Sequence, residues 1–285
     1  MSRLYHVVIP CAFLVFLGGN AINFIAQEEW TLASFNIRFD NPSDPLRWES
    51  RRGKVAQVIG NYDIVGIQEA LPHQVQDLVD QLPWMRHVGQ GREEGGGGEA
   101  CPIFYHKAKW ELLHSETLWL SGDWKCPGTV GWEADLPRIV TVAWFHHLKS
   151  GKCVRVFNTH WSHMSSSERA RSACLIASID AIHGTDAAVV LGDFNEEESG
   201  KGRQTLELAG FTDTFSDVRN RCKRFFPTYT TFQPEGSHGG PRIDAIYVKG
   251  LATRWICVDE IIQGEYFISD HLPVHARVVW EGDGE

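Results

Sequence analysis

The stretch VVLGDFNEE, residues 189–197, joins an apolar run to polar residues, and it decides how we interpret the rest of the chain. The apolar run is long enough for a short buried strand, and Gly192 at its end predicts a close backbone approach or a sharp turn. Asp193 and Asn195 are two positions apart, so on an extended backbone both point to the same side. We therefore expect both to face one cavity, while Phe194 turns into the core. An Asx turn after a strand is the alternative that this stretch alone leaves open.

The length of 285 residues allows one large domain or two small ones. Apolar residues make up 43% of the chain and charged residues 22%, as in ordinary globular proteins. The 11 Trp and 15 Phe predict an aromatic-rich core. The formal net charge of -9 disfavours a broad electrostatic grip on duplex nucleic acid, because such a grip needs many Lys and Arg side chains.

The N-terminal residues 1–21 have the pattern of a secretory signal peptide. A positive charge precedes the apolar segment Val7–Leu17, and the small residues Gly19 and Ala21 follow where cleavage would occur. The apolar segment is too short for a convincing membrane span. We expect a secreted protein with no stable membrane partner. The alternative is an uncleaved membrane anchor, because apolar residues resume at Ile22.

Six cysteines remain outside this leader, and an even number in a secreted chain permits disulfides. No CxxC pair is present, which argues against a zinc site built on thiolates. Cys101, Cys153 and Cys257 lie beside apolar runs, and we expect them to be small buried hydrophobes.

Short strand-like runs alternate with a few helical segments from Trp30 onward, without a repeat or a linker that would split the chain. Apolar residues at helical spacing or with serine caps predict helices at 48–61, 71–82, 165–182 and 202–210. Strands are predicted at 31–39, 63–70, 101–106, 117–120, 139–145, 153–161, 187–195, 242–248 and 274–280. This pattern favours one sheet-rich α/β domain over residues 30–281.

Several of the predicted strands end in, or contain, residues that do not belong in an apolar core. These are Asn36, Glu69, His160, Asp193, Asn195, Asp244, Asp270 and His271. Each has an ordinary explanation, such as a turn cap or a charge at a helix start. Burying one carboxylate without a partner is costly, but several are tolerable if they converge on a cation. Carboxylate and amide oxygens suit magnesium, manganese or calcium better than zinc.

The ordered series SFNIR, IQEAL, NTHW, LGDFN, RID and SDHLPV resembles the endonuclease/exonuclease/phosphatase superfamily, which includes the DNase I-like nucleases. The resemblance runs from about Thr31 to Trp280, and NPSDPLRWESRR and LPRIVT resemble stretches of its bacterial and fungal secreted members. It implies a four-layer α/β sandwich, with two packed sheets and helices on both outer faces. It also implies a metal-dependent phosphoester hydrolase.

The resemblance implies a role for each matching residue. Asn36, Glu69 and Asp270 resemble the metal ligands, for Mg²⁺ or Mn²⁺, with Ca²⁺ as a further option. Asp193 resembles the carboxylate that orients and deprotonates the attacking water, and Asn195 the amide that holds a phosphate oxygen.

The other matching residues are basic or acidic groups around the phosphate. His271 resembles the histidine that contacts the scissile phosphate, and Asp244 the carboxylate that orients it. His160 resembles the second histidine, which protonates the leaving oxygen. Glu99 stands where relatives keep a carboxylate partner for that histidine, so we expect it to keep His160 protonated. Arg138 stands where they keep a phosphate-binding arginine.

Glu99 and His163 have a weaker basis. Glu99 follows four glycines and is alternatively a solvated loop residue. His163 lies three residues after His160 and either lines the pocket or begins a helix without a functional role. His106 stands where many relatives carry Arg. Signatures of a particular substrate are not recognisable.

The leading hypothesis is a monomeric, metal-dependent phosphoesterase that hydrolyses a phosphomonoester or phosphodiester, with a small or headgroup substrate favoured. A nuclease is the alternative within the family. The best basic patch for nucleic acid is RNRCKR, residues 219–224, followed by the aromatic loop FFPTYTTF, which would either stack bases or belong to the core. A catalytically inactive binding module is less consistent with so many intact site residues. A glycosidase with paired carboxylates is disfavoured by the histidines and by GDFN.

The leader generates the first prediction. We expect the exported protein to begin at Ile22, because the small residues of GNA meet the requirements for cleavage after Ala21. N-terminal sequencing of the secreted product measures this directly. A membrane-bound product that retains Met1 would instead show an anchor.

Overall fold

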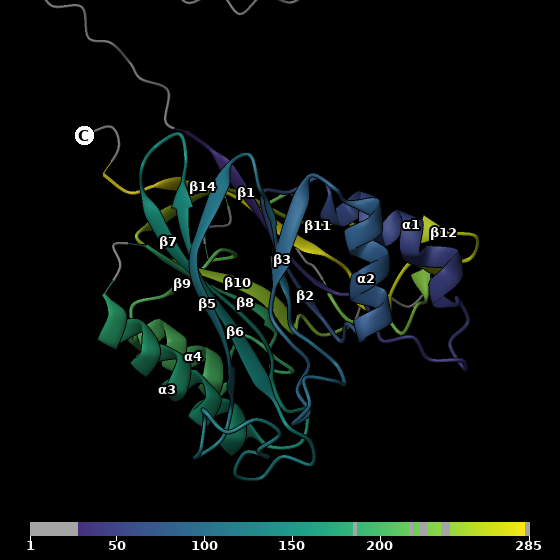
Figure 1. The fold of residues 1–285 in the computed structure, drawn as a ribbon, viewed down its shortest axis with the longest axis horizontal. Coiled ribbons are helices and arrows are strands. Elements are labelled where there is room, and N and C mark those ends of the chain that lie inside the picture. The colour runs from purple at the N-terminus through teal and green to yellow at the C-terminus, as the bar shows by residue number, and fades with distance from the viewer. Residues whose placement is uncertain are drawn as a thin grey trace, which may run out of the picture.

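Two six-stranded β-sheets lie face to face at the centre of the computed structural model (Figure 1). The structure describes residues 28–184, 187–216, 219, 221–222, 227–234 and 240–282. The predicted leader and the basic residues Lys223 and Arg224 lie outside the described residues. Within the described ranges, the helices are all too short or too polar to cross a bilayer.

The first sheet has the strand order β11-β14-β1-β2-β4-β3. Its strands are β1 (Trp30–Asn36), β2 (Ile64–Gln68), β3 (Met85–Val88), β4 (Ile103–His106), β11 (Leu251–Val258) and β14 (Val274–Trp280). The second sheet has the order β5-β6-β7-β8-β10-β9. Its strands are β5 (Trp110–Trp119), β6 (Ile139–His147), β7 (Cys153–His160), β8 (Ala188–Asp193), β9 (Thr212–Asp213) and β10 (Asp244–Lys249). A separate hairpin pairs β12 (Ile262–Gln263) with β13 (Tyr266–Phe267).

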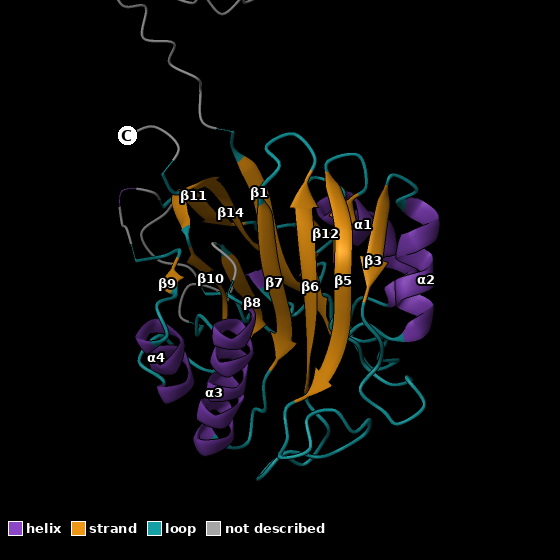
Figure 2. Ribbon diagram, turned by 60° about the vertical axis from the view of Figure 1, so that its left-hand side comes forward, coloured by secondary structure: helices purple, strands orange, loops and turns teal. Residues whose placement is uncertain are grey.

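Helices cover the outer face of each sheet (Figure 2). The first sheet carries α1 (Trp48–Ile59) and α2 (Pro72–Gln81), and the second carries α3 (Ser166–His183) and α4 (Lys201–Leu208). The capping of α3 follows its sequence, since Ser165 accepts a hydrogen bond from the backbone N–H of Glu168. The four layers confirm the α/β sandwich expected from the resemblance.

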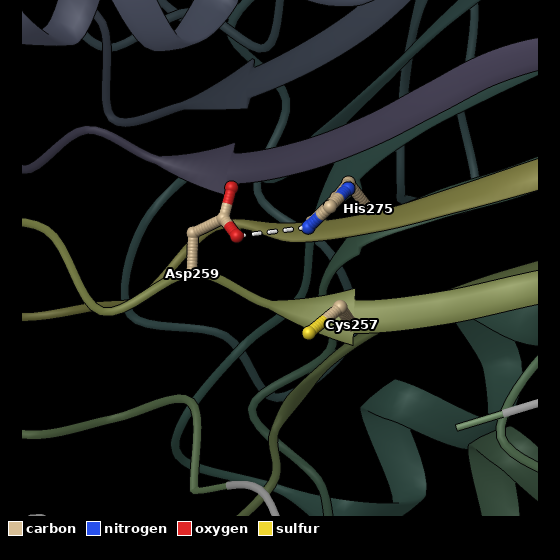
Figure 3. Close-up of side chains that lie close together, drawn as sticks. All are labelled: Cys257, Asp259 and His275. Atoms are coloured by element: carbon tan, nitrogen blue, oxygen red, sulfur yellow. Dashed lines mark hydrogen bonds and ion pairs between the residues drawn. The ribbon is translucent and has the colours of Figure 1, made fainter. Parts of the chain in front are cut away.

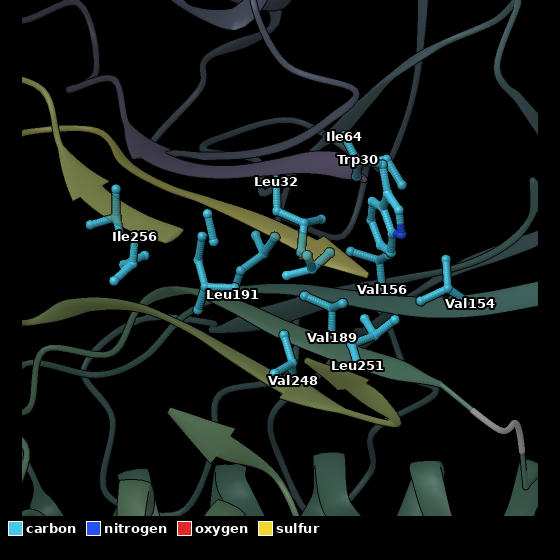
Figure 4. Close-up of a cluster of buried hydrophobic side chains, with 14 of the residues drawn as sticks. Trp30, Leu32, Ile64, Val154, Val156, Val189, Leu191, Val248, Leu251 and Ile256 are labelled. Carbon is cyan, nitrogen blue, oxygen red and sulfur yellow. The ribbon is translucent and has the colours of Figure 1, made fainter. Parts of the chain in front are cut away.

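The core consists of three apolar layers, one between the sheets and one under each pair of helices. Figure 4 shows the middle layer, where Leu32 and Ile64 of the first sheet face Val156, Val189 and Leu191 of the second. Burying one such side chain fully contributes about 1.5–3 kcal/mol. This layer therefore supplies much of the free energy that holds the two sheets together.

Strand register brings the polar strand ends to one edge of the sandwich. In the first sheet β1 and β2 are parallel, and Asn36 is opposite Gln68. In the second sheet β7 and β8 are parallel, with His160 opposite Asp193, and Asp193 is also opposite Asp244 on β10. Parallel neighbours end at the same edge of a sheet, so residues distant in sequence become neighbours there.

A buried amide pair links the two sheets just beneath this edge. Gln68 Nε2 donates to Asn158 Oδ1 at 2.7 Å, and Asn158 Nδ2 donates to the carbonyls of Ile67 and Pro102 at 2.9 and 2.8 Å. Both amide side chains are fully buried. Because these bonds join β7 to the β2–β4 region, they fix the position of one sheet relative to the other.

Most predicted elements are present, but the edge strands were harder to anticipate. β3 and β11, the two edge strands of the first sheet, were not predicted. An edge strand has a neighbouring strand on one side only, so it can form with less apolar residues than a central strand and gives a weaker sequence signal. The expectation for Phe194 is confirmed. Its ring is fully buried and packs edge-on against Trp161 and Tyr247, with centroids 4.6 and 5.7 Å away.

The cysteines only partly match the expectation. Cys101 is buried, as predicted, but Cys153 is exposed because it is the first residue of β7, beside a turn. Cys257 is buried and forms a disulfide with Cys222, with a Cα–Cα separation of 5.3 Å.

The inter-sheet amide pair generates a stability prediction. Asn158→Ala removes three buried hydrogen bonds, those with Gln68 Nε2 and with the carbonyls of Ile67 and Pro102, so we expect a loss of about 2–4 kcal/mol in the free energy of unfolding. Urea unfolding measures it, with Asn61→Ala at an exposed site as the control. Equal stabilities of the two variants would contradict a linking role.

Candidate active site

A cleft of about 480 Å³ opens at the edge where the polar strand ends meet. Nine of the residues predicted from the sequence line it: Glu69, Glu99, Arg138, His160, His163, Asp193, Asn195, Asp270 and His271. The other two, Asn36 and Asp244, are fully buried directly behind them. The structure therefore brings all of the predicted site residues into one region.

Backbone strain is concentrated at this cleft. Within the described ranges, the non-glycine residues with positive φ are Arg38, Glu69, Asn195, Thr231 and Phe232, at 56°, 61°, 47°, 55° and 68°. The first three line the cleft, and the other two belong to a loop that is tied to the site residue Asp270 through Thr230. Each such residue costs of order 1–3 kcal/mol. The strained backbone conformations direct side chains into the cleft, and the rest of the fold compensates for their cost.

The GDFN motif leaves β8 through a turn and not on the expected extended backbone, since Asn195 has a φ of 47°. Gly192 crosses so close to β7 that a Cβ there would lie 2.1 Å from the carbonyl oxygen of Thr159, so only glycine fits. Asp193 Oδ1 accepts the backbone N–H of Asn195 at 2.9 Å. Asn195 Nδ2 lies 3.0 Å from both His160 Nε2 and the carbonyl of Trp161. The Asx turn and the shared cavity, posed as alternatives from the sequence, are both present.

Asp193, Asp244 and His271 form a buried triad. His271 Nδ1 donates to Asp244 Oδ2 at 2.8 Å, and His271 Nε2 lies 3.6 Å from Asp193 Oδ2. Burial lowers the pKa of His271, but Asp244 and Asp193 outweigh it and raise that pKa well above its ordinary value. Burial, and then Asp244, raise the pKa of Asp193 to about 7. His271 is therefore an imidazolium cation at neutral pH.

The carboxylates of Glu69 and Asp270 lie on the other side of the cleft. Arg38 Nη1 is 3.9 Å from Glu69 Oε2 and 3.6 Å from Asp270 Oδ2. Burial raises the pKa of Asp270, and Glu69 raises it further. Asn36 Nδ2 donates to Glu69 Oε1 and to Asp193 Oδ2, at 3.0 Å each. Asn36 thus orients two carboxylates. Its Oδ1 accepts a hydrogen bond from the backbone N–H of Arg38, so Asn36 can bind a metal ion through Oδ1 only if its amide reorients.

These residues fit a divalent cation bound through oxygen. The donor atoms of Asp193, Asp244 and His271 lie within 4.8 Å of one another, and Asp244 Oδ1 is buried without a hydrogen-bond partner. The protonated imidazole of His271 offers no lone pair, so the carboxylates are the donors. Glu69 and Asp270 are the best placed to hold the ion, because the ion pairs that the described residues make with them are loose contacts with Arg38, at 3.9 and 3.6 Å.

Glu99 differs from the expectation. It forms a two-pronged ion pair with Arg92, at 2.9 and 3.0 Å, instead of pairing with His160. Burial, and then Arg138 and His271, lower the pKa of His160 well below its ordinary value. His160 is therefore neutral at neutral pH, and its Nε2 accepts from Asn195. The expectation that Glu99 keeps His160 protonated is wrong for this structure, because an arginine from the same loop takes the carboxylate.

Arg138 and His163 form the wall beside His160. Arg138 Nη2 lies 3.2 Å from His163 Nδ1, whereas Arg138 Nε and Nη1 are buried without a partner. Arg138 as a whole is only 4% exposed. Buried N–H groups of a cation without a partner are costly, and an anionic substrate group would satisfy them. His163 therefore lines the pocket, which settles one of the two alternatives posed from the sequence.

Six lining residues were not predicted from the sequence, and three of them carry polar groups: Arg38, Arg92 and Tyr229. Arg38 could have been found, since it lies two positions after Asn36 in the SFNIR motif. Arg92 belongs to a glycine-rich loop without a recognisable signal. Tyr229 belongs to the aromatic loop, and its ring, 37% exposed, meets His271 edge-on at 5.0 Å.

Comparison with known proteins agrees with this geometry. A family model described as the Endonuclease/Exonuclease/phosphatase family matches residues 33–271. The chain belongs to this family. It is consequently a phosphoester hydrolase, a class that includes phosphatases and nucleases. A search of curated proteins found no match.

Several solved structures are similar. An endonuclease/exonuclease/phosphatase from Bacteroides vulgatus is 34% identical, with a TM-score of 0.83, and the match covers 90% of this chain and 100% of that one. A mannosyl-6-phosphatase from Bacteroides thetaiotaomicron is 27% identical, with a TM-score of 0.80, over 88% and 100% of the two chains. The human Nocturnin catalytic domain, 17% identical with a TM-score of 0.68 over 88% and 93%, shares the fold.

The raised pKa of Asp193 generates a prediction for the metal-free protein. Its pKa is about 7 when folded and 3.8 in a model compound, so the folded state loses stability as the pH rises between these values. Asp193→Asn removes this loss. We expect it to be inactive, yet more stable by about 1–2 kcal/mol at about pH 7.5 in EDTA, with a smaller gain at about pH 4.5.

Urea unfolding at the two pH values measures the difference. Asp123→Asn, at an exposed position, is the matched control and should change stability by less than about 0.5 kcal/mol. A gain that is the same at both pH values would show that titration of Asp193 is not its cause.

Proposed function

We propose that this phosphoester hydrolase depends on a divalent cation and acts on a small phosphoester, with phosphorylated sugars the favoured class. One observation carries the proposal. A carboxylate suited to act as a base, Asp193, lies in the same 480 Å³ cleft as a charged imidazole and the partly unpartnered guanidinium of Arg138. The 27% identity to a mannosyl-6-phosphatase supports the substrate class.

Asp193 is the base in this proposal. Water attacks phosphorus while its proton passes to Asp193 Oδ2; the new P–O bond forms as the bond to the leaving oxygen breaks. Asn36 and the Asn195 backbone N–H hold Asp193 in place, because each donates to one of its oxygens. A pKa near 7 makes Asp193 a better proton acceptor than an ordinary aspartate.

The charged groups of the cleft bind the phosphoryl oxygens. His271, kept protonated by Asp244, and Arg138 place positive charge where negative charge grows in the transition state. The Asn195 amide adds a neutral donor in the wall. Neutral His160 fixes that amide, so its role is to position Asn195 and not to supply a proton.

A divalent cation at Glu69 and Asp270 would withdraw charge from the phosphoryl and leaving oxygens. The leaving oxygen then takes its proton from solvent. Arg38 Nη1 lies 3.9 Å from Glu69 and 3.6 Å from Asp270, and its positive charge keeps both carboxylates in place.

A nuclease is the second candidate, and the exposed ring of Tyr229 beside His271 is the feature that favours it. The described part of the basic stretch does not strengthen this candidate. The guanidinium of Arg221 donates to the carbonyl of Phe215, and Cys222 is tied to Cys257. A zebrafish (D. rerio) TDP2 complex with a single-stranded DNA product is only 15% identical and shows the fold alone.

The metal dependence is tested with a chromogenic phosphomonoester. Activity should disappear in EDTA and return with Mg²⁺ or Mn²⁺. Glu69→Gln should lower kcat/KM by about 100-fold or more at limiting Mg²⁺, because a neutral amide binds the ion more weakly than a carboxylate. Glu207→Gln, exposed on α4, is the control and should retain full activity. Undiminished turnover in EDTA would refute the proposal.

The substrate class is tested by comparing kcat/KM across a panel at about 150 mM salt, where long-range steering is screened. We expect hexose 6-phosphates to exceed DNA and RNA oligonucleotides by at least about tenfold, because two of the arginines that line the cleft, Arg38 and Arg92, are already held in ion pairs with Asp44 and Glu99. Tyr229→Ala should affect the oligonucleotides no more than the sugar phosphates. A preference for polynucleotide that Tyr229→Ala abolishes would establish the nuclease instead.

A further inference from the structure

Cys257, Asp259 and His275 form a second cluster of metal-binding side chains, separate from the catalytic cleft. Their donor atoms lie within 4.8 Å of one another, and none of the three lines the cleft (Figure 3). Sheet pairing fixes two of them, since Cys257 on β11 is directly opposite His275 on β14. Asp259 follows immediately after β11. The backbone thus holds the cluster whatever the redox state of the cysteine.

The cluster is ordered by contacts of its own. His275 Nε2 lies 2.9 Å from Asp259 Oδ1, and the Tyr62 hydroxyl donates to Asp259 Oδ2 at 2.7 Å. The rings of Tyr62 and Trp255 pack on His275, with centroids 4.9 and 5.0 Å away. The imidazole and the carboxylate are therefore already oriented, which lowers the cost of binding an ion.

The disulfide determines whether the sulfur is available. In this structure Cys257 is bonded to Cys222, so it offers no thiolate. The backbone N–H of Cys222 also donates to the carbonyl of Ile256, at 3.0 Å, which keeps Cys222 beside β11 without the S–S bond. Reduction would thus leave the Cys257 thiol beside one imidazole and one carboxylate, with the Cys222 thiol adjacent to that of Cys257. Four ligands of these kinds are the set that Zn²⁺ takes in tetrahedral sites.

We propose that reduction of the Cys222–Cys257 disulfide creates a zinc site made of Cys222, Cys257, Asp259 and His275. A dithiol reductant supplies two electrons and two protons, becoming a cyclic disulfide as the protein S–S bond breaks. Zn²⁺ then displaces one proton from each thiol that it binds. The side chain of Asp259 is 34% exposed and gives the ion a route from solvent. The expectation against thiolate zinc rested on spacing alone, whereas here register between strands assembles the donors.

Cobalt reports on this site, because only thiolate ligands give charge-transfer absorption in the near ultraviolet, and the oxygen ligands of the catalytic cleft do not. We titrate full-length protein with Co²⁺, followed by Zn²⁺ displacement. We expect no thiolate band in the oxidised protein. After reduction we expect a band that saturates at one Co²⁺ per protein molecule. Cys222→Ser should show the band without any reductant, because its Cys257 is free. The double variant Cys222→Ser/Cys257→Ser should lack it under every condition.

Two further variants separate this site from adventitious binding. Cys153→Ser, at an exposed free thiol, should leave the band unchanged. Tyr62→Phe removes a hydrogen bond to Asp259 and should weaken Co²⁺ binding by about tenfold. Near-ultraviolet circular dichroism confirms that each variant is folded. A missing band in both the reduced wild type and folded Cys222→Ser, or a band that survives in the double variant, would overturn the proposal.

Discussion

The burial of four carboxylates at one edge of the sandwich is the constraint on which the site depends. Asp193, Asp244 and Asp270 are less than 10% exposed, and Glu69 lies beside them with a strained backbone. Isolated charges in such a place would be prohibitively costly. The fold meets the constraint with an imidazolium, a guanidinium and an amide, and the remaining negative charge is what a divalent cation would neutralise.

The same burial gives the two histidines opposite states. His271 is surrounded by Asp244 and Asp193, so attraction outweighs the loss of solvent and the ring stays charged. His160 has Arg138 and His271 nearby and only one loose contact with Asp193, so burial prevails and the ring is neutral. One histidine can thus stabilise phosphate charge while the other accepts a hydrogen bond and positions Asn195. The two pKa values differ because the neighbouring charges differ, and not because one ring is more deeply buried than the other.

The sequence predicted the strand ends better than the loops, for a physical reason. Asp193 and Asn195 follow an apolar run, and parallel pairing carries such ends to one edge, so their convergence follows from local patterns. The partner of Glu99 could not be predicted in this way. Arg92 reaches it from within the same glycine-rich loop, whose path depends on tertiary contacts and not on periodicity. The edge strand β11 was missed for a similar reason, although it carries Cys257.

The central claim, that the buried carboxylates form a cation site, is tested most directly by the thermal midpoint of unfolding as a function of Mg²⁺. Asp270→Asn is compared with the wild type after removal of metal with EDTA. At about 100 times the dissociation constant, binding adds about 2.7 kcal/mol, which corresponds to a rise of about 5 to 10 °C for a chain of this size. We predict this rise for the wild type and a much smaller one for Asp270→Asn. An equal rise in both proteins, or none in the wild type, would contradict the account.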